Sequence, residues 1–127
     1  MLSINNQKPQ FFTEKEFKCK CGCGLVTMDK DFVSRLDNAR RIAGIPFHIN
    51  SGFRCVKHNA KVGGAKRSSH VFGLAADIGV SDSPSRFKII NALLTAGFTR
   101  IGIGWSMIHV DADPSKEQNC IWVYQDK

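Results

Sequence analysis

The sequence predicts a single α+β domain in which a small antiparallel sheet is flanked by helices. Apolar residues recur at helical spacing early in the chain, and short apolar strands cluster near its end. The chain has 127 residues and 43% hydrophobic content, which is enough to bury a sizeable core. We therefore expect residues 1–127 to form one domain.

Two helices are predicted in the first third of the chain. Thr13 and Glu16 form a capping-box pattern in "TEKEF", which indicates a short helix. From about 29 to 43, apolar residues repeat with the period of an amphipathic helix. Gly44 follows at the position where a helix C-terminal cap is expected.

The remaining elements are a strand, a third helix and a group of late strands. The stretch "PFHINSG" predicts a strand that leads into a turn. Ser83 and Pro84 indicate the start of a helix that runs to Gly97. The late strands are predicted in "RIGIGW", "MIHVDA" and "CIWVY".

The charge balance favours an anionic partner, because 18 Lys and Arg stand against 11 Asp and Glu, a net charge of +7. The basic residues are scattered and lack interleaved aromatic residues, so nucleic acid is not the expected partner. No apolar run approaches the ~20 residues of a membrane span, and "MLSINNQKPQ" has no apolar signal-peptide core. We expect a monomer that is synthesised in the cytoplasm and does not insert stably into membranes.

Five cysteines are many for a chain of this length, and three of them crowd into "CKCGCG". Thiolates are good zinc ligands, but the C-x-C-x-C spacing lacks the C-x₂-C knuckle that is typical of structural zinc sites. A disulfide from Cys19 or Cys21 to Cys55, or plain buried thiols, is the favoured interpretation. Cys23 and Cys120 complete the set.

The stretch "SSHVFGLAAD" places His70 and Asp77 seven residues apart, with small and apolar residues between them. His109 lies on a predicted strand, and Asp111, two residues later, should face the same way. Two histidines and a carboxylate are the donors of many catalytic zinc sites. A histidine in an apolar strand is also typical of a hydrogen-bonded core residue, so spacing alone leaves both interpretations open.

Three motifs, in order, resemble the zinc D-Ala-D-Ala carboxypeptidase family. "SSHVFGLAAD" is similar to its S-x-H-x-x-G-x-A-x-D signature, "SGFR" to its S-G-[FY]-R element, and "IHVD" to its second histidine motif. The chain as a whole resembles short single-domain members found in phages and prophages. The resemblance implies the zinc fold shared by D,D-carboxypeptidases, vancomycin-resistance dipeptidases, phage L-alanoyl-D-glutamate endolysins and the hedgehog signalling domain.

The resemblance also implies the roles of individual residues. It implies that His70, Asp77 and His109 bind one catalytic Zn²⁺ ion. Arg54 and Ser68 are expected to bind substrate, with Arg54 reaching the scissile carbonyl and steadying the oxyanion.

The sequence departs from the family pattern at one position. Several members carry a catalytic acid three residues before the second histidine, where this chain has Ser106. Serine cannot act as the general base, and Asp111 is the nearest carboxylate on the right strand face. Asp111 is therefore predicted either to be the general base or to orient a histidine ligand, and both roles stay open.

The expected function is zinc-dependent cleavage of peptidoglycan stem peptides, either as a D-Ala-D-Ala carboxypeptidase or as an endolysin-like L-Ala-D-Glu endopeptidase. The protein would act on the cell wall, in the periplasm, after release from the cytoplasm. The alternative is a non-catalytic module on the same fold that contains zinc and binds peptidoglycan or a protein.

Overall fold

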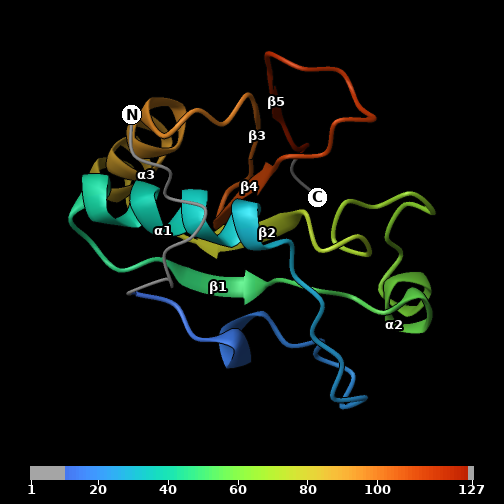
Figure 1. Cartoon of the computed structure of the whole chain (residues 1–127). Coiled ribbons are helices and arrows are strands. Elements are labelled where there is room, and N and C mark those ends of the chain that lie inside the picture. The colour runs from blue at the N-terminus through green and yellow to red at the C-terminus, as the bar shows by residue number, and fades with distance from the viewer. Residues whose placement is uncertain (1–10, 126–127) are drawn as a thin grey trace.

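The computed structural model describes residues 11–125 and confirms the predicted α+β class (Figure 1). The expectation about a signal peptide concerns residues 1–10, which lie outside the described part. In chain order the elements are η1 (Glu14–Phe17), α1 (Lys30–Ala43), β1 (His48–Ser51), α2 (Val56–Lys61), β2 (Ala75–Gly79), α3 (Ser83–Thr95), β3 (Arg100–Ile103), β4 (Met107–Asp111) and β5 (Cys120–Val123).

The first predicted helix, η1, is a single 3₁₀ turn. The backbone N–H of Thr13 donates to the Glu16 carboxylate at 2.7 Å, as a capping box requires.

Helix α1 begins and ends close to the predicted positions. The Asp29 carboxylate caps it by accepting from the Phe32 N–H at 2.9 Å. Gly44 ends it with a φ of 72°, which is the left-handed conformation that glycine adopts without strain.

Helix α3 starts as predicted and ends two residues earlier than expected. The side chain of Asp82, which precedes Ser83, accepts a hydrogen bond from the Ser85 N–H at 2.8 Å. The helix ends at Thr95, and Gly97 follows with a φ of 98°. Helix α2 is not among the elements that the sequence predicts, because six residues complete fewer than two helical turns and give little periodicity.

The five strands form one sheet in the order β1-β2-β4-β3-β5. The pairs β1·β2, β2·β4 and β3·β4 are antiparallel, as predicted. The pair β3·β5 is parallel, so the sheet is mixed: it is antiparallel as predicted except at this edge. The cause is the loop after β4: that strand ends beside the start of β3, and the loop crosses there to set Cys120 opposite Arg100.

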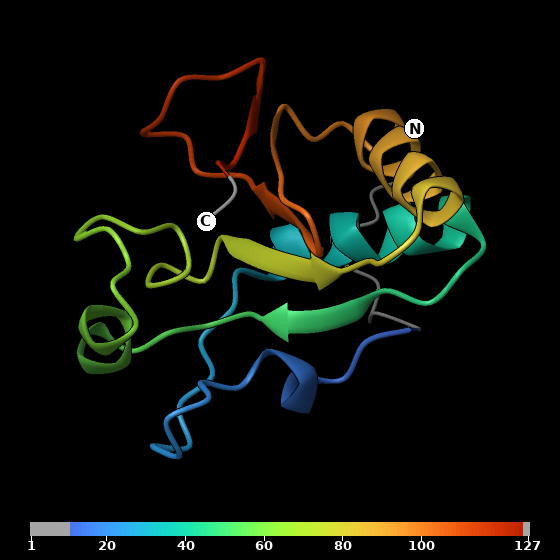
Figure 2. The ribbon, with the colours of Figure 1, turned by 180° about the vertical axis from the view of Figure 1, so that it is seen from behind.

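The two faces of β2 and β4 have opposite character because side chains alternate along a strand. Ala76, Ile78, Ile108 and Val110 are fully buried in the core cluster, which also contains apolar side chains of α1 and α3. Figure 1 shows α1 in front of β2, and Figure 2, from behind, shows β2 in front of α1. The intervening residues of β2 and β4 lie on the face away from α1.

None of the helices in residues 11–125 combines the length and the apolar character that a bilayer span needs.

Candidate metal centre

Three residues that the sequence singled out, His70, Asp77 and His109, come together on the sheet face away from α1. The register of β2 and β4 sets Asp77 directly opposite His109, and His70 lies in the turn that precedes β2. One Asp77 oxygen, Oδ1, lies 2.9 Å from His109 Nδ1 and 3.3 Å from His70 Nε2. One ligand atom from each residue lies within 4.8 Å of the other two. This is the donor set of a candidate metal centre.

The turn that presents His70 is built by its own motif residues. Ser68 Oγ accepts a hydrogen bond from the His70 N–H at 3.2 Å, which fixes the turn. Gly73 has a φ of 72°, and a Cβ there would collide with the carbonyl oxygen of Thr27. The Asp29 N–H donates to the Gly73 carbonyl at 2.9 Å. The motif glycine therefore lets the turn pass close to the segment that leads into α1.

Each histidine has one ring nitrogen held away from the shared centre. His70 Nδ1 lies 2.8 Å from the Gly52 carbonyl oxygen, which can only accept, so Nδ1 carries the proton and Nε2 is left for a ligand role. His109 Nε2 lies 2.7 Å from Asp111 Oδ2, which leaves Nδ1 toward Asp77. Metal-binding histidines characteristically donate their second nitrogen to a carbonyl or carboxylate in this way.

The ionisable groups of the centre stabilise one another's charged forms. Burial raises the pKa of Asp77, but hydrogen bonds from His109 and His70 outweigh burial and hold this pKa well below its usual range. Burial lowers the pKa of His109, and its bonds to Asp111 and Asp77 raise the pKa above its ordinary value. Burial raises the pKa of Asp111, and hydrogen bonds from His109 and Arg100 lower it overall. Both aspartates are therefore carboxylates at neutral pH.

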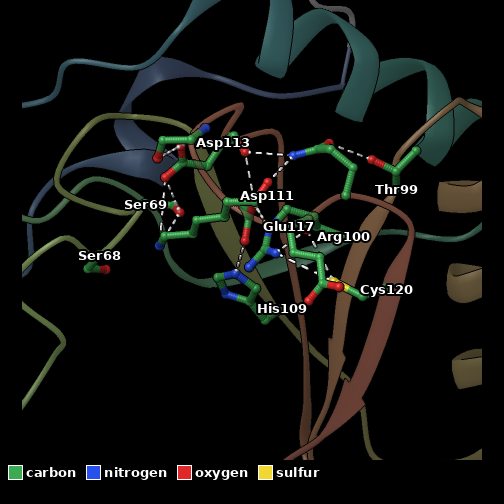
Figure 3. A network of polar contacts seen from close by, with 12 residues as sticks. Ser68, Ser69, Thr99, Arg100, His109, Asp111, Asp113, Glu117 and Cys120 are labelled. Carbon is green, nitrogen blue, oxygen red and sulfur yellow. Dashed lines mark hydrogen bonds and ion pairs between the residues drawn. The ribbon is translucent and has the colours of Figure 1, made fainter.

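Asp111 lies behind His109, on the predicted strand face, and is only 1% exposed. Its Oδ2 accepts from His109 Nε2, and its Oδ1 accepts from Arg100 Nε at 2.7 Å and from the Asp113 N–H at 3.2 Å. Figure 3 shows these contacts converging on the Asp111 carboxylate. The prediction that Asp111 and His109 face the same way is confirmed, and both Asp111 oxygens are occupied.

Arg54 lies at the edge of the centre, with 17% of its side chain exposed. Its Nη2 lies 3.6 Å from Asp77 Oδ2. Nη1 donates to Asn59 Oδ1 at 3.0 Å, and Nε donates to Ser51 Oγ at 3.3 Å. The structure thus brings Arg54 to the candidate ligands and holds its guanidinium in one orientation.

Ser68, predicted to bind substrate, contacts the backbone of its own turn, and Figure 3 shows it apart from the network around Asp111. Its neighbour Ser69, which was not predicted, is 2% exposed and donates to Asp113 Oδ2 at 2.8 Å. Lys116 Nζ donates to Ser69 Oγ at 2.8 Å. Asp113 also accepts from the N–H of Ser115 at 3.0 Å. These contacts fasten the loop after β4 to the turn that carries His70.

Two further residues around His109 were missed from the sequence. Arg100 donates to Asp111, and its guanidinium lies 4.8 Å from the centre of the Trp122 ring. The ring centres of Trp122 and His109 lie 5.6 Å apart. A Cβ on Gly102, the β3 partner of His109, would collide with Trp122. That glycine was the available signal, since a glycine inside a strand often marks a close approach.

Comparisons with known proteins agree with this geometry. A family model described as Peptidase M15 matches residues 10–113. Over 56 residues the chain is 43% identical to the zinc D-Ala-D-Ala carboxypeptidase of Streptomyces albus G. That alignment covers 44% of this chain and 22% of the Streptomyces protein, so the chain matches about a fifth of the relative's length.

Proposed function

Because this chain belongs to the peptidase M15 family, we propose that it is a zinc peptidase that cleaves the stem peptides of peptidoglycan. The observation that carries the proposal is the meeting of His70, Asp77 and His109, with the second ring nitrogen of each histidine already held by a protein acceptor. The partial identity to a zinc D-Ala-D-Ala carboxypeptidase supports both the metal and the substrate class.

The donor set fits a catalytic zinc ion. His70 Nε2, Asp77 Oδ1 and His109 Nδ1 are two imidazoles and one carboxylate, and three protein ligands leave a fourth position of zinc for water or substrate. Zinc bound there would supply Lewis-acid chemistry, which makes water a competent nucleophile near neutral pH and polarises a carbonyl. The side chains of the protein would bind the substrate and orient the ligands.

The role we propose for Arg54 is to bind the carbonyl oxygen of the scissile amide as negative charge develops on it. Asn59 and Ser51 orient the guanidinium before substrate arrives, so little reorganisation is needed during the reaction. Its partial exposure leaves it accessible to substrate. A charge-assisted contact of this kind is worth about 3 kcal/mol in the transition state.

For Asp111 we infer the orienting role rather than general-base catalysis. Its two oxygens accept three hydrogen bonds, from His109, Arg100 and the Asp113 N–H. A water could reach this carboxylate only by displacing one of those donors, because Asp111 is 1% exposed. Hydrogen bonds from His109 and Arg100 keep Asp111 ionised, and Asp111 in turn keeps the proton of His109 on Nε2.

The proposed substrates share one chemical pattern, an amide bond close to a carboxylate. The D-Ala-D-Ala terminus and the L-Ala-D-Glu bond of the stem peptide both have it, and the net charge of +7 suits an anionic wall polymer. An enzyme of this kind acts at the cell wall, and cleavage of the L-Ala-D-Glu bond would make it endolysin-like.

Digestion of purified peptidoglycan, followed by mass spectrometry of the products, tests the proposal. Release of terminal D-Ala identifies a carboxypeptidase, and new L-Ala and D-Glu ends identify the endopeptidase. Whichever product is formed, its release should stop when a chelator is added and resume when zinc is restored. His70→Ala is the matched inactive control.

Zinc-loaded protein that binds peptidoglycan but releases no product would overturn the enzymatic proposal. It would support the alternative of a non-catalytic binding module. The occupied carboxylate of Asp111, together with serine at position 106, is the specific observation behind that alternative.

A further inference from the structure

A second group of metal-binding side chains lies outside the centre described above, and we propose that it holds a structural zinc ion. Sγ atoms of four cysteines, which come from two separate segments, all lie within 4.8 Å of one another. The members of this thiol cluster are Cys19, Cys21, Cys23 and Cys55. The proposal does not rest on the proposed function, because none of the four belongs to the His/Asp centre.

The spacing of three of the sulfurs is that of ligands around one ion. Cys19 Sγ lies 3.5 Å from Cys21 Sγ and 3.7 Å from Cys55 Sγ, and the last two sulfurs are also 3.7 Å apart. Four thiolates bound tetrahedrally at about 2.3 Å place neighbouring sulfurs about 3.8 Å apart. A disulfide would need about 2.05 Å.

The sequence left two interpretations open, a disulfide from Cys19 or Cys21 to Cys55 or plain buried thiols. The described structure has five free cysteines and no such disulfide, but only Cys19 is buried, whereas Cys21 and Cys23 are exposed. The missing C-x₂-C spacing did not reveal this cluster, because its fourth thiol comes from a distant segment of the chain. Cys55 lies 36 residues after Cys19 along the chain.

Backbone N–H groups already point at three of the sulfurs. The Cys55 N–H donates to Cys19 Sγ at 3.4 Å, and the His58 N–H donates to Cys55 Sγ at 3.3 Å. The Leu25 N–H donates to Cys23 Sγ at 3.5 Å. Such bonds stabilise thiolates more than neutral thiols, because hydrogen bonds to a charged acceptor are stronger. They are the outer contacts expected around bound thiolates.

The loop that carries three of the cysteines is irregular, although the Cys19 N–H donates to the Leu25 carbonyl at 3.0 Å. No helix or strand is present between η1 and α1, and Cys21 and Cys23 are exposed. Gly22 and Gly24 have φ values of 89° and 80°, so the chain can turn sharply on both sides of Cys23. A zinc ion would fasten this loop to the segment after β1, as structural zinc sites do in small domains.

Four thiolates complete the tetrahedron of zinc and leave no position for water, so the ion in the thiol cluster would be structural. Soft sulfur donors favour zinc over magnesium or calcium. Cys55 directly follows Arg54, and it caps helix α2, whose Asn59 holds the Arg54 guanidinium. The proposed ion therefore supports the segment that presents Arg54 to the His/Asp centre.

Metal content measured under reducing conditions tests the proposal. Wild-type protein should contain two zinc ions per chain, and His70→Ala and Cys23→Ser should each contain one. Cys55→Ser should also contain one, and its hydroxyl can still cap α2, so loss of the cap does not explain loss of the ion. Cys120→Ser is the matched control and should keep two, because Cys120 contacts Arg100 and the Glu117 carbonyl and not the thiol cluster.

Cobalt substitution gives a readout that is independent of activity. His70→Ala loaded with Co²⁺ should show the strong near-ultraviolet absorption of cobalt thiolates, and the His70→Ala, Cys55→Ser double variant should lose it. If the cysteine variants do not fold, the His70→Ala protein decides alone, since all four thiols are intact in it.

Several results would overturn the proposal. One is wild-type protein with a single zinc ion and His70→Ala with none. Another is iron instead of zinc in the purified protein. A third is a mass lowered by disulfide formation, with no reactive thiols among the four cysteines.

Discussion

The two donor clusters of this protein differ in how much of their geometry the protein itself supplies. In the His/Asp centre, Asp77 and His109 lie on paired strands, and their register is set by the backbone hydrogen bonds of β2 and β4. In the thiol cluster, three of four donors lie on an irregular loop. Strand pairing fixes the donors of the His/Asp centre, whereas the loop places its sulfurs through turns and single backbone N–H contacts.

The donor chemistry differs in the same sense. Two imidazoles and one carboxylate leave a coordination position open, and four thiolates leave none. The paired strands carry the His/Asp centre, which leaves a coordination position open. The irregular loop carries most of the thiol cluster, whose four sulfurs fill every position. A preorganised site is expected for catalysis, because its groups need not move as charge develops.

One short segment joins the two clusters. The Gly52 carbonyl accepts from His70, Arg54 lies beside Asp77, and Cys55 belongs to the thiol cluster. Loss of either ion should therefore disturb the other cluster through residues 52–55, but with effects of different size.

The largest effect is expected when the His/Asp centre loses one of its proposed zinc ligands. His70→Ala should reduce kcat/KM by about 10³-fold or more, since Lewis-acid stabilisation is worth several kcal/mol and each 1.36 kcal/mol is a factor of ten. Steady-state kinetics on a defined stem peptide measures it. Activity near that of the wild type would mean that the His/Asp centre is not the catalytic one.

The next effect concerns the segment between the clusters. Arg54→Ala should lower kcat by about 10²–10³-fold while zinc content stays constant, because it removes a contact to the developing oxyanion and no metal ligand. Arg35→Ala, an exposed arginine on α1 and therefore on the other face of the sheet, is the control. A rise in KM with unchanged kcat would assign Arg54 to ground-state binding instead.

Asp111→Asn tests how far the His/Asp centre depends on a residue that contacts a proposed ligand but not the metal. Zinc affinity should fall about 10- to 100-fold, and activity should return in excess zinc, because the carboxylate orients His109. Zinc titration and kcat on one preparation give both quantities. A kcat lowered by about 10²-fold at full occupancy would instead identify Asp111 as the general base.

The smallest effect is expected from Asp113, whose hydrogen bonds fasten the loop after β4 near the His/Asp centre without any metal ion. Burial raises the pKa of Asp113, but hydrogen bonds from Ser115 and Ser69 outweigh it and lower this pKa to about 2, against 3.8 unperturbed. The stabilisation is fully present above pH 4 and is lost as the pH falls toward 2, when the carboxylate is protonated in the folded protein too.

Asp113→Asn should therefore lower the free energy of unfolding by about 1–2 kcal/mol at pH 6, and the difference from wild type should shrink between pH 4 and pH 2. Urea unfolding of chelated protein at several pH values measures it without metal. A difference that stays constant with pH would mean that the carboxylate charge contributes nothing.

The sequence by itself determined the elements and residues whose signals are local. Helix α3 starts at the predicted residue and α1 within one residue of it, because caps and helical periods act within a few positions. Asp111 shares a strand face with His109 because alternation along a strand is local too. The proposed ligands His70, Asp77 and His109 followed from motif resemblance, and the structure brings them together.

Tertiary structure decided what depends on segments distant in sequence. The parallel pairing of β5 follows from where the loop after β4 crosses the sheet. Arg100 reaches Asp111 across neighbouring strands, and Cys55 reaches Cys19 over 36 residues. No periodicity or spacing signals such contacts, because chain folding, and not the local conformation of either segment, places their partners side by side.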